Sequence, residues 1–121
     1  MLKYPSMRYE LVADLESLAG LDLSPGALHI AIRWVLDSSG LWDDPAETAI
    51  GVFLRDTDEA ALVNVVVRLL DELVTQSGGR ISEHDYRARP EWPPIERAAA
   101  AAHALLCQND RRFPGTYDED A

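Results

Sequence analysis

Between residues 56 and 79, apolar residues recur every three or four positions, which is the period of one face of an α-helix. Polar residues occupy the opposite side. The members of the apolar stripe are Leu62, Val65, Val66, Leu69, Leu70, Leu73 and Val74. Asp56 and Glu59 have capping-box spacing, and Gly78-Gly79 permits a left-handed helix exit. The pattern predicts a long amphipathic helix over 57–76 with its stripe in the core.

Two helices are predicted before this one. Ser6 is expected to cap the first, which ends before Gly20, and Ser24-Pro25 is a start signal for the second. The segment 27–36 is ambiguous, because its apolar residues fit both a helical period and the alternation of a strand. The proline start and the length favour a helix, and the strand stays an alternative.

Further helices are predicted on both sides of the long one. A short helix is expected over 46–54 with Asp44 as its cap, a single turn over 82–86, and an Ala-rich helix over 95–108. The prolines between 90 and 94 are expected to exclude a helix there. The fold class is therefore all-α: a single-domain, compact bundle of four main helices plus one or two short ones. The domain is expected to span residues 1–110, followed by a flexible acidic tail over 111–121.

Charge narrows the possible partners. The chain of 121 residues has 21 acids and 11 bases, a net charge of −10. An acidic surface repels phosphate, so a nucleic-acid partner is not expected, whereas a basic protein would be attracted. The alternative is that acidity only keeps the protein soluble. The single cysteine, Cys107, excludes an internal disulfide, and no apolar run reaches the ~20 residues that span a membrane. We expect a cytoplasmic protein.

Candidate chemistry is sparse. His29, Arg33 and Asp37 recur every four residues beside Asp43, so they could form a pocket with a base and an anion clamp. The alternative is a solvent-facing row with an Arg33–Asp37 pair. His103 and Cys107 have a spacing that suits two metal ligands, but two ligands are not a site. No metal and no cofactor is therefore expected.

The three tryptophans allow two interpretations. Trp34, Trp42 and Trp92 either fill gaps between helix ends or anchor a partner on the surface. In the second case the binding surface would combine acidic loop residues with the region around the last tryptophan, namely Trp42, Asp43, Asp44, Arg89 and Trp92. Such neighbouring acidic and basic patches also make a homodimer possible.

Two segments carry a family resemblance. Residues 51–60 with the following long helix, and residues 85–93 before the Ala-rich helix, resemble a group of small uncharacterised actinobacterial proteins over about residues 41–106. The resemblance implies a mostly helical domain and no particular site. From charge and size we expect a non-enzymatic, immunity- or antitoxin-like module that binds a basic protein. The alternative is a small hydrolase or ligand-binding domain that uses the His29/Arg33/Asp37/Asp43 pocket.

Overall fold

The computed structural model describes residues 2–21, 24, 26–41, 43–77 and 83–112. Over these residues the protein is all-α, as predicted, with five α-helices and no strand. One π-helical turn and one 3-10 turn are added to the α-helices. The elements in chain order are α1 (Pro5–Leu18), α2 (Ala27–Arg33), η1 (Trp34–Ser38), η2 (Ala46–Ala49), α3 (Thr57–Ser77), α4 (Glu83–Ala88) and α5 (Trp92–Arg112).

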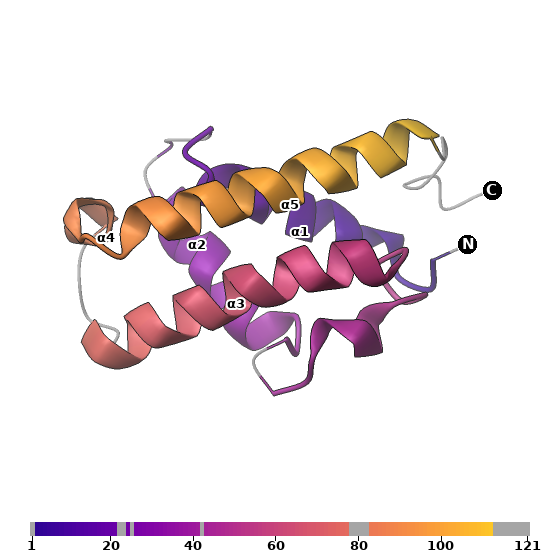
Figure 1. The fold of residues 1–121 in the computed structure, drawn as a ribbon, viewed down its shortest axis with the longest axis horizontal. Coiled ribbons are helices and arrows are strands. Elements are labelled where there is room, and N and C mark those ends of the chain that lie inside the picture. The colour runs from indigo at the N-terminus through magenta and orange to yellow at the C-terminus, as the bar shows by residue number, and fades with distance from the viewer. Residues whose placement is uncertain (1, 22–23, 25, 42, 78–82, 113–121) are drawn as a thin grey trace.

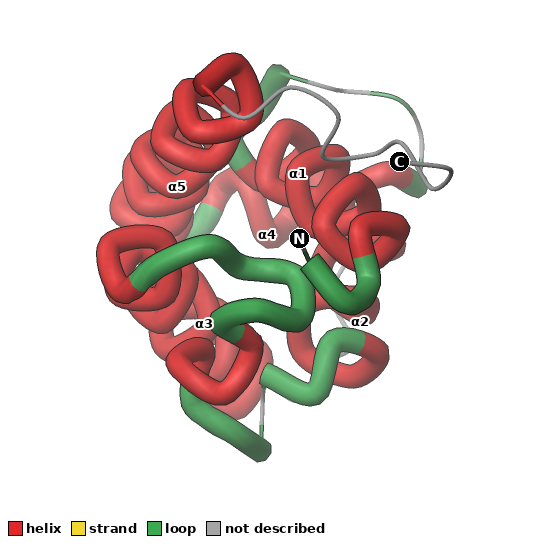
Figure 2. The backbone as a smooth tube through the Cα atoms, turned by 90° about the vertical axis from the view of Figure 1, so that its right-hand side faces the viewer, coloured by secondary structure: helices red, strands yellow, loops and turns green. Residues whose placement is uncertain are grey.

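The helices form two packed layers. The two longest helices, α3 and α5, lie side by side, and α1 and α2 cover the face behind them (Figures 1 and 2). The core between the layers is apolar, because each helix turns one side of aliphatic residues inward. Its largest fully buried apolar side chains are Leu11, Leu15, Leu18, Leu28, Leu54, Leu70, Leu73, Trp92, Ile95 and Leu106.

The long helix is confirmed, with α3 at Thr57–Ser77. Its buried side is rotated relative to the predicted stripe. Ala60, Val63 and Val67 are buried, whereas Leu62 and Leu69 are only partly buried. Neither this 21-residue helix nor any other in the described ranges combines the length and apolarity needed to cross a membrane.

The last helix is longer at both ends than the predicted 95–108. It starts at Trp92, because a first helical turn needs no amide donors and therefore tolerates Pro93 and Pro94. It continues to Arg112, so the predicted tail at 111–121 begins with two helical residues. Residues 113–121 lie outside the described part of the chain.

The third predicted helix, over 46–54, is wrong beyond its first turn. η2 ends at Ala49, and Gly51 has a φ of +86°, which a continuing helix does not allow. The carbonyl of Gly51 accepts a hydrogen bond from the amide of Lys3 at 3.0 Å, so the chain start is tied to this turn. The first helix accordingly begins at Pro5 rather than being capped by Ser6.

The ambiguous segment 27–36 is helical, so the strand alternative is excluded. α2 starts after Gly26, whose φ of +83° gives the left-handed entry, and Pro25 is outside the described residues. The helix widens into the π turn η1, which ends at Ser38. A π turn accommodates an extra residue within a helix, and within this turn Val35 and Leu36 are buried in the core.

The orientation of α3 can be tested at two adjacent leucines, one fully buried and one partly buried. Replacing Leu70, which is fully buried, by Ala should lower the free energy of unfolding by about 2–5 kcal/mol. Leu69→Ala is the matched control and should lower it by less, because Leu69 is only partly buried. Urea denaturation followed by circular dichroism measures both. Equal losses would contradict the orientation of α3.

Candidate functional site

The residues of the expected pocket lie on the surface. His29, Arg33, Asp37 and Asp43 are all exposed. The His29 ring makes an edge-on contact with Tyr86 of α4, with 5.9 Å between ring centroids. The exposure of these four residues agrees with the alternative of a solvent-facing row. A general base is usually activated by partial burial, which these positions do not provide.

The expected partner-binding residues are divided between surface and interior. Asp43 and Asp44 are exposed, whereas Trp42 falls outside the described residues. Trp92 is only 1% exposed, so the suggestion that its ring is a surface anchor is wrong. Its ring instead fills the space beside Tyr86, at a centroid distance of 6.5 Å. Arg89 is half-buried, and its Nε lies 3.4 Å from Glu91 Oε2.

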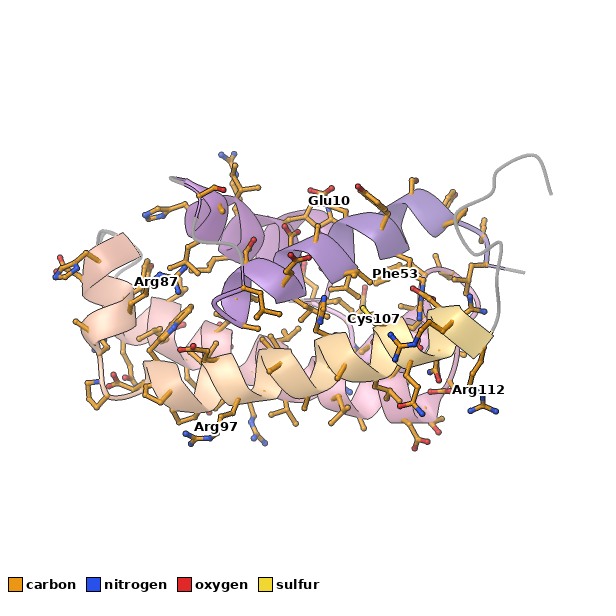
Figure 3. The ribbon with its side chains drawn as sticks, turned by 90° about the horizontal axis from the view of Figure 1, so that it is seen from above. Glu10, Phe53, Arg87, Arg97, Cys107 and Arg112 are labelled. Atoms are coloured by element: carbon orange, nitrogen blue, oxygen red, sulfur yellow. The ribbon has the colours of Figure 1, made fainter. Side chains whose placement is uncertain are left out.

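The one His–Cys pair faces another helix. Cys107 Sγ lies 3.6 Å from His103 Nε2, and the same nitrogen lies 4.0 Å from Glu16 Oε2 of α1. Figure 3 shows Cys107 on the side of α5 that faces α1. Burial raises the pKa of the Cys107 thiol, and Asp110 adds to the effect. The thiol form is not the nucleophile or the metal ligand. In the described ranges no three His, Cys, Asp or Glu side chains form a metal-binding group.

The most highly connected polar residue is one that the sequence interpretation overlooked. Arg8 on α1 is fully buried, and its guanidinium meets Glu59 of α3 through two hydrogen bonds of 2.8 Å. Its Nε donates to Asp110 of α5 at 2.8 Å. The remaining donors reach the backbone carbonyls of Phe53 at 3.1 Å and Leu106 at 3.3 Å. All five N–H groups of this guanidinium are therefore bonded.

Glu59 is equally well satisfied. Its Oε1 also accepts from the amide of Arg55 at 2.7 Å, and its Oε2 from Asn109 Nδ2 at 2.7 Å. Burial alone would raise the pKa of Glu59, but the hydrogen bonds from Arg8, Arg55 and Asn109 outweigh it and hold the pKa below its usual value. The carboxylate is therefore charged in the folded protein.

This buried cluster has a structural role. A guanidinium with every donor used, and no exposed surface, has nothing left to offer a substrate. Two signals in the sequence pointed to it. Arg8 falls on the apolar face of α1 with Leu11 and Leu15, and Glu59 is the third residue after the cap Asp56, to whose Oδ1 its amide donates at 2.9 Å.

A small hollow lies at the opposite end of α3. It measures about 160 Å³, and apolar residues form much of its wall. The lining residues are Leu69, Glu72, Leu73, Gln76, Glu91 and Pro94. None of the candidate catalytic residues contributes to it, so this hollow does not provide the expected enzyme pocket.

The buried pair can be tested by a double-mutant cycle. Arg8→Met should lower the free energy of unfolding by about 3–5 kcal/mol, because it leaves the Glu59 carboxylate buried without its cation. Adding Glu59→Gln should recover part of this loss, since the orphaned charge is then removed. The cycle is measured by urea denaturation. Additive effects of the two substitutions would show that the two side chains do not interact.

Comparison with known proteins places the chain in a family. The family model described as a domain of unknown function (DUF7945) matches residues 2–114, and the chain belongs to this family. No curated protein and no solved structure matches the chain.

Proposed function

We propose that this DUF7945 protein is a non-enzymatic, acidic interaction module that binds a basic protein, in the manner of an immunity protein or antitoxin. The supporting observation is how its charges are distributed. The oppositely charged side chains of Arg8 and Glu59 are buried as a pair, whereas many of the remaining acids are exposed. With a net charge of −10, the surface attracts cations over the distance at which encounter is steered.

One segment of the chain carries five of these exposed acids. We call it the acidic edge; it consists of Asp43, Asp44, Glu47, Asp56 and Asp58, all of which are exposed. Arg55 is the base within this stretch, and its Nη2 lies 3.5 Å from Asp110. The acidic edge therefore keeps most of its negative charge available to a partner.

The acidic edge is held in a defined shape. The side chain of Asn64 on α3 accepts from the amide of Ala46 at 2.9 Å and donates to Glu47. The Asp56 carboxylate caps α3 through the amide of Glu59. Figure 1 shows the segment that carries the edge running along the lower side of the molecule, beside the first half of α3. Such preorganisation reduces the entropy lost on binding.

The enzyme alternative has less support. A hydrolase of this kind would need His29, Arg33, Asp37 and Asp43 to converge in a concave, partly dry site. All four are exposed, and none lines the hollow beside α3. The interaction model requires only an exposed charged surface on a stable scaffold, which is the arrangement that the described residues have.

We place the protein in a bacterial cytoplasm. A single, unpaired cysteine is typical of a reducing compartment. The bacterial assignment follows the resemblance to small actinobacterial proteins over residues 41–106. The cytoplasmic location and the bacterial origin both belong to the proposal, and neither depends on the acidic edge.

The proposal is tested by affinity capture from native lysate with matched charge variants. The edge variant carries Asp43→Lys and Asp44→Lys. The control carries Glu72→Lys and Asp85→Lys, which change the net charge equally at exposed sites outside the acidic edge. Wild type and control should retain the same basic protein at low salt and release it at high salt, because surface charge pairs are screened by salt. The edge variant should retain at least tenfold less.

Circular dichroism and the unfolding midpoint check that all three proteins are folded. Two outcomes would contradict the proposal. The first is that no basic protein is retained by wild type at either salt concentration. The second is equal retention by the edge variant, which would show that the contact lies elsewhere on the surface.

A further inference from the structure

Asp14 of α1 is a second buried carboxyl. Arg8, Arg55 and Asn109, which donate hydrogen bonds to Glu59, do not donate to Asp14. The residue is 4% exposed, and its Oδ2 atom is buried without a hydrogen-bond partner. Buried carboxylates are normally paired or multiply hydrogen-bonded, because an isolated charge in an apolar interior is very unfavourable. Asp14 therefore differs from Glu59, which is fully buried but accepts four hydrogen bonds.

Asp14 lies on the side of α1 that faces away from α5. Glu16, two residues later, approaches His103 of α5, and residues two positions apart point to nearly opposite sides of a helix. Glu10, one turn before Asp14, also lies on the side away from α5 (Figure 3). The helices packed against α1 are α2, η1 and α5. The carboxyl of Asp14 is thus placed towards the layer formed by α2 and η1.

No cation on these elements neutralises Asp14. On α2 and η1 the titratable residues are His29, Arg33 and Asp37, and all three are exposed. On α5 the titratable residues that lie towards α1 are Glu96, His103, Cys107 and Asp110, and they lie on the flank of α1 that faces α5, away from Asp14. The charged group that acts on Asp14 is Glu10, which repels its ionised form.

We propose that Asp14 is a pH switch within the scaffold: the neutral carboxyl allows α1 to pack on α2, and loss of its proton to solvent loosens that contact. The other flank of α1 stays attached, because Arg8 ties it to α3 and α5. The opening is therefore local to the α1–α2 contact. This device is independent of the proposed binding of a basic partner.

The direction of the effect follows from linkage. Burial, with a contribution from Glu10, raises the pKa of Asp14 from 3.8 to about 7. Between these two values the folded protein binds more protons than the unfolded chain, so its stability falls as the pH rises. The stabilising effect is complete below the unfolded pKa and is lost as the pH passes through the folded value. From pH 5 to pH 8, Asp14 should increase the unfolding equilibrium constant about a hundredfold.

The first test compares wild type, Asp14→Asn and Asp37→Asn by urea denaturation between pH 5 and pH 8. All other titratable groups are shared, so differences between the curves isolate the substituted residue. The difference between wild type and Asp14→Asn should change about a hundredfold across the range. Asp37→Asn, at an exposed position of η1, should run parallel to wild type. A pH-independent difference for Asp14→Asn would overturn the proposal.

A second measurement uses the wild-type protein alone and stands if Asp14→Asn does not fold. The carbon-13 signal of the Asp14 carboxyl should titrate with a midpoint near neutral pH. Amide hydrogen exchange should show that protection of α2 relative to α3 falls on raising the pH from 6 to 8, since comparison within one sample removes the intrinsic pH effect. A midpoint below 5, or a constant ratio of protection, would show that Asp14 is no switch.

Discussion

The buried pair of Arg8 and Glu59 is the interaction on which the rest of the fold depends, because it joins three helices and one turn at a single point. The guanidinium comes from α1 and the carboxylate from α3, and Asn109 and Asp110 of α5 complete the cluster. Breaking such a pair leaves a charge in an apolar interior, so misaligned helices are strongly disfavoured. The apolar core supplies stability, and the pair favours the relative arrangement of the helices in which its charges meet.

The parts of the fold that could be predicted are those that local rules determine. The long periodic segment became α3, and the proline start and length correctly favoured a helix over 27–36. The errors arose where distant contacts decide. The predicted 46–54 helix ends after its first turn at Ala49, and the amide of Lys3, far away in the sequence, bonds to the carbonyl of Gly51 in the loop that follows. Asn109 and Asp110 extend α5 because their partners lie on other helices.

The candidate site was less predictable than the fold, because residue types along a chain do not show which side chains converge. His29, Arg33 and Asp37 lie on the surface, and Trp92 lies in the core. What the sequence does indicate is the excess of acids, and the described residues show many of them exposed. The proposed function, which is based on an acidic surface, therefore depends on the scaffold, which keeps the acidic edge exposed while Arg8 and Glu59 are buried.

The most direct test of this account is a nuclear magnetic resonance titration of the Glu59 carboxyl in the folded protein. Because hydrogen bonds from Arg8, Arg55 and Asn109 outweigh the effect of burial, the carboxyl should stay ionised below its ordinary pKa of 4.5. A group with a lowered pKa stabilises the fold above its unfolded value, so stability should be lost as the pH falls through the folded pKa. A titration midpoint of Glu59 at or above 4.5 would contradict the claim that a charged, buried pair of Arg8 and Glu59 joins the three helices.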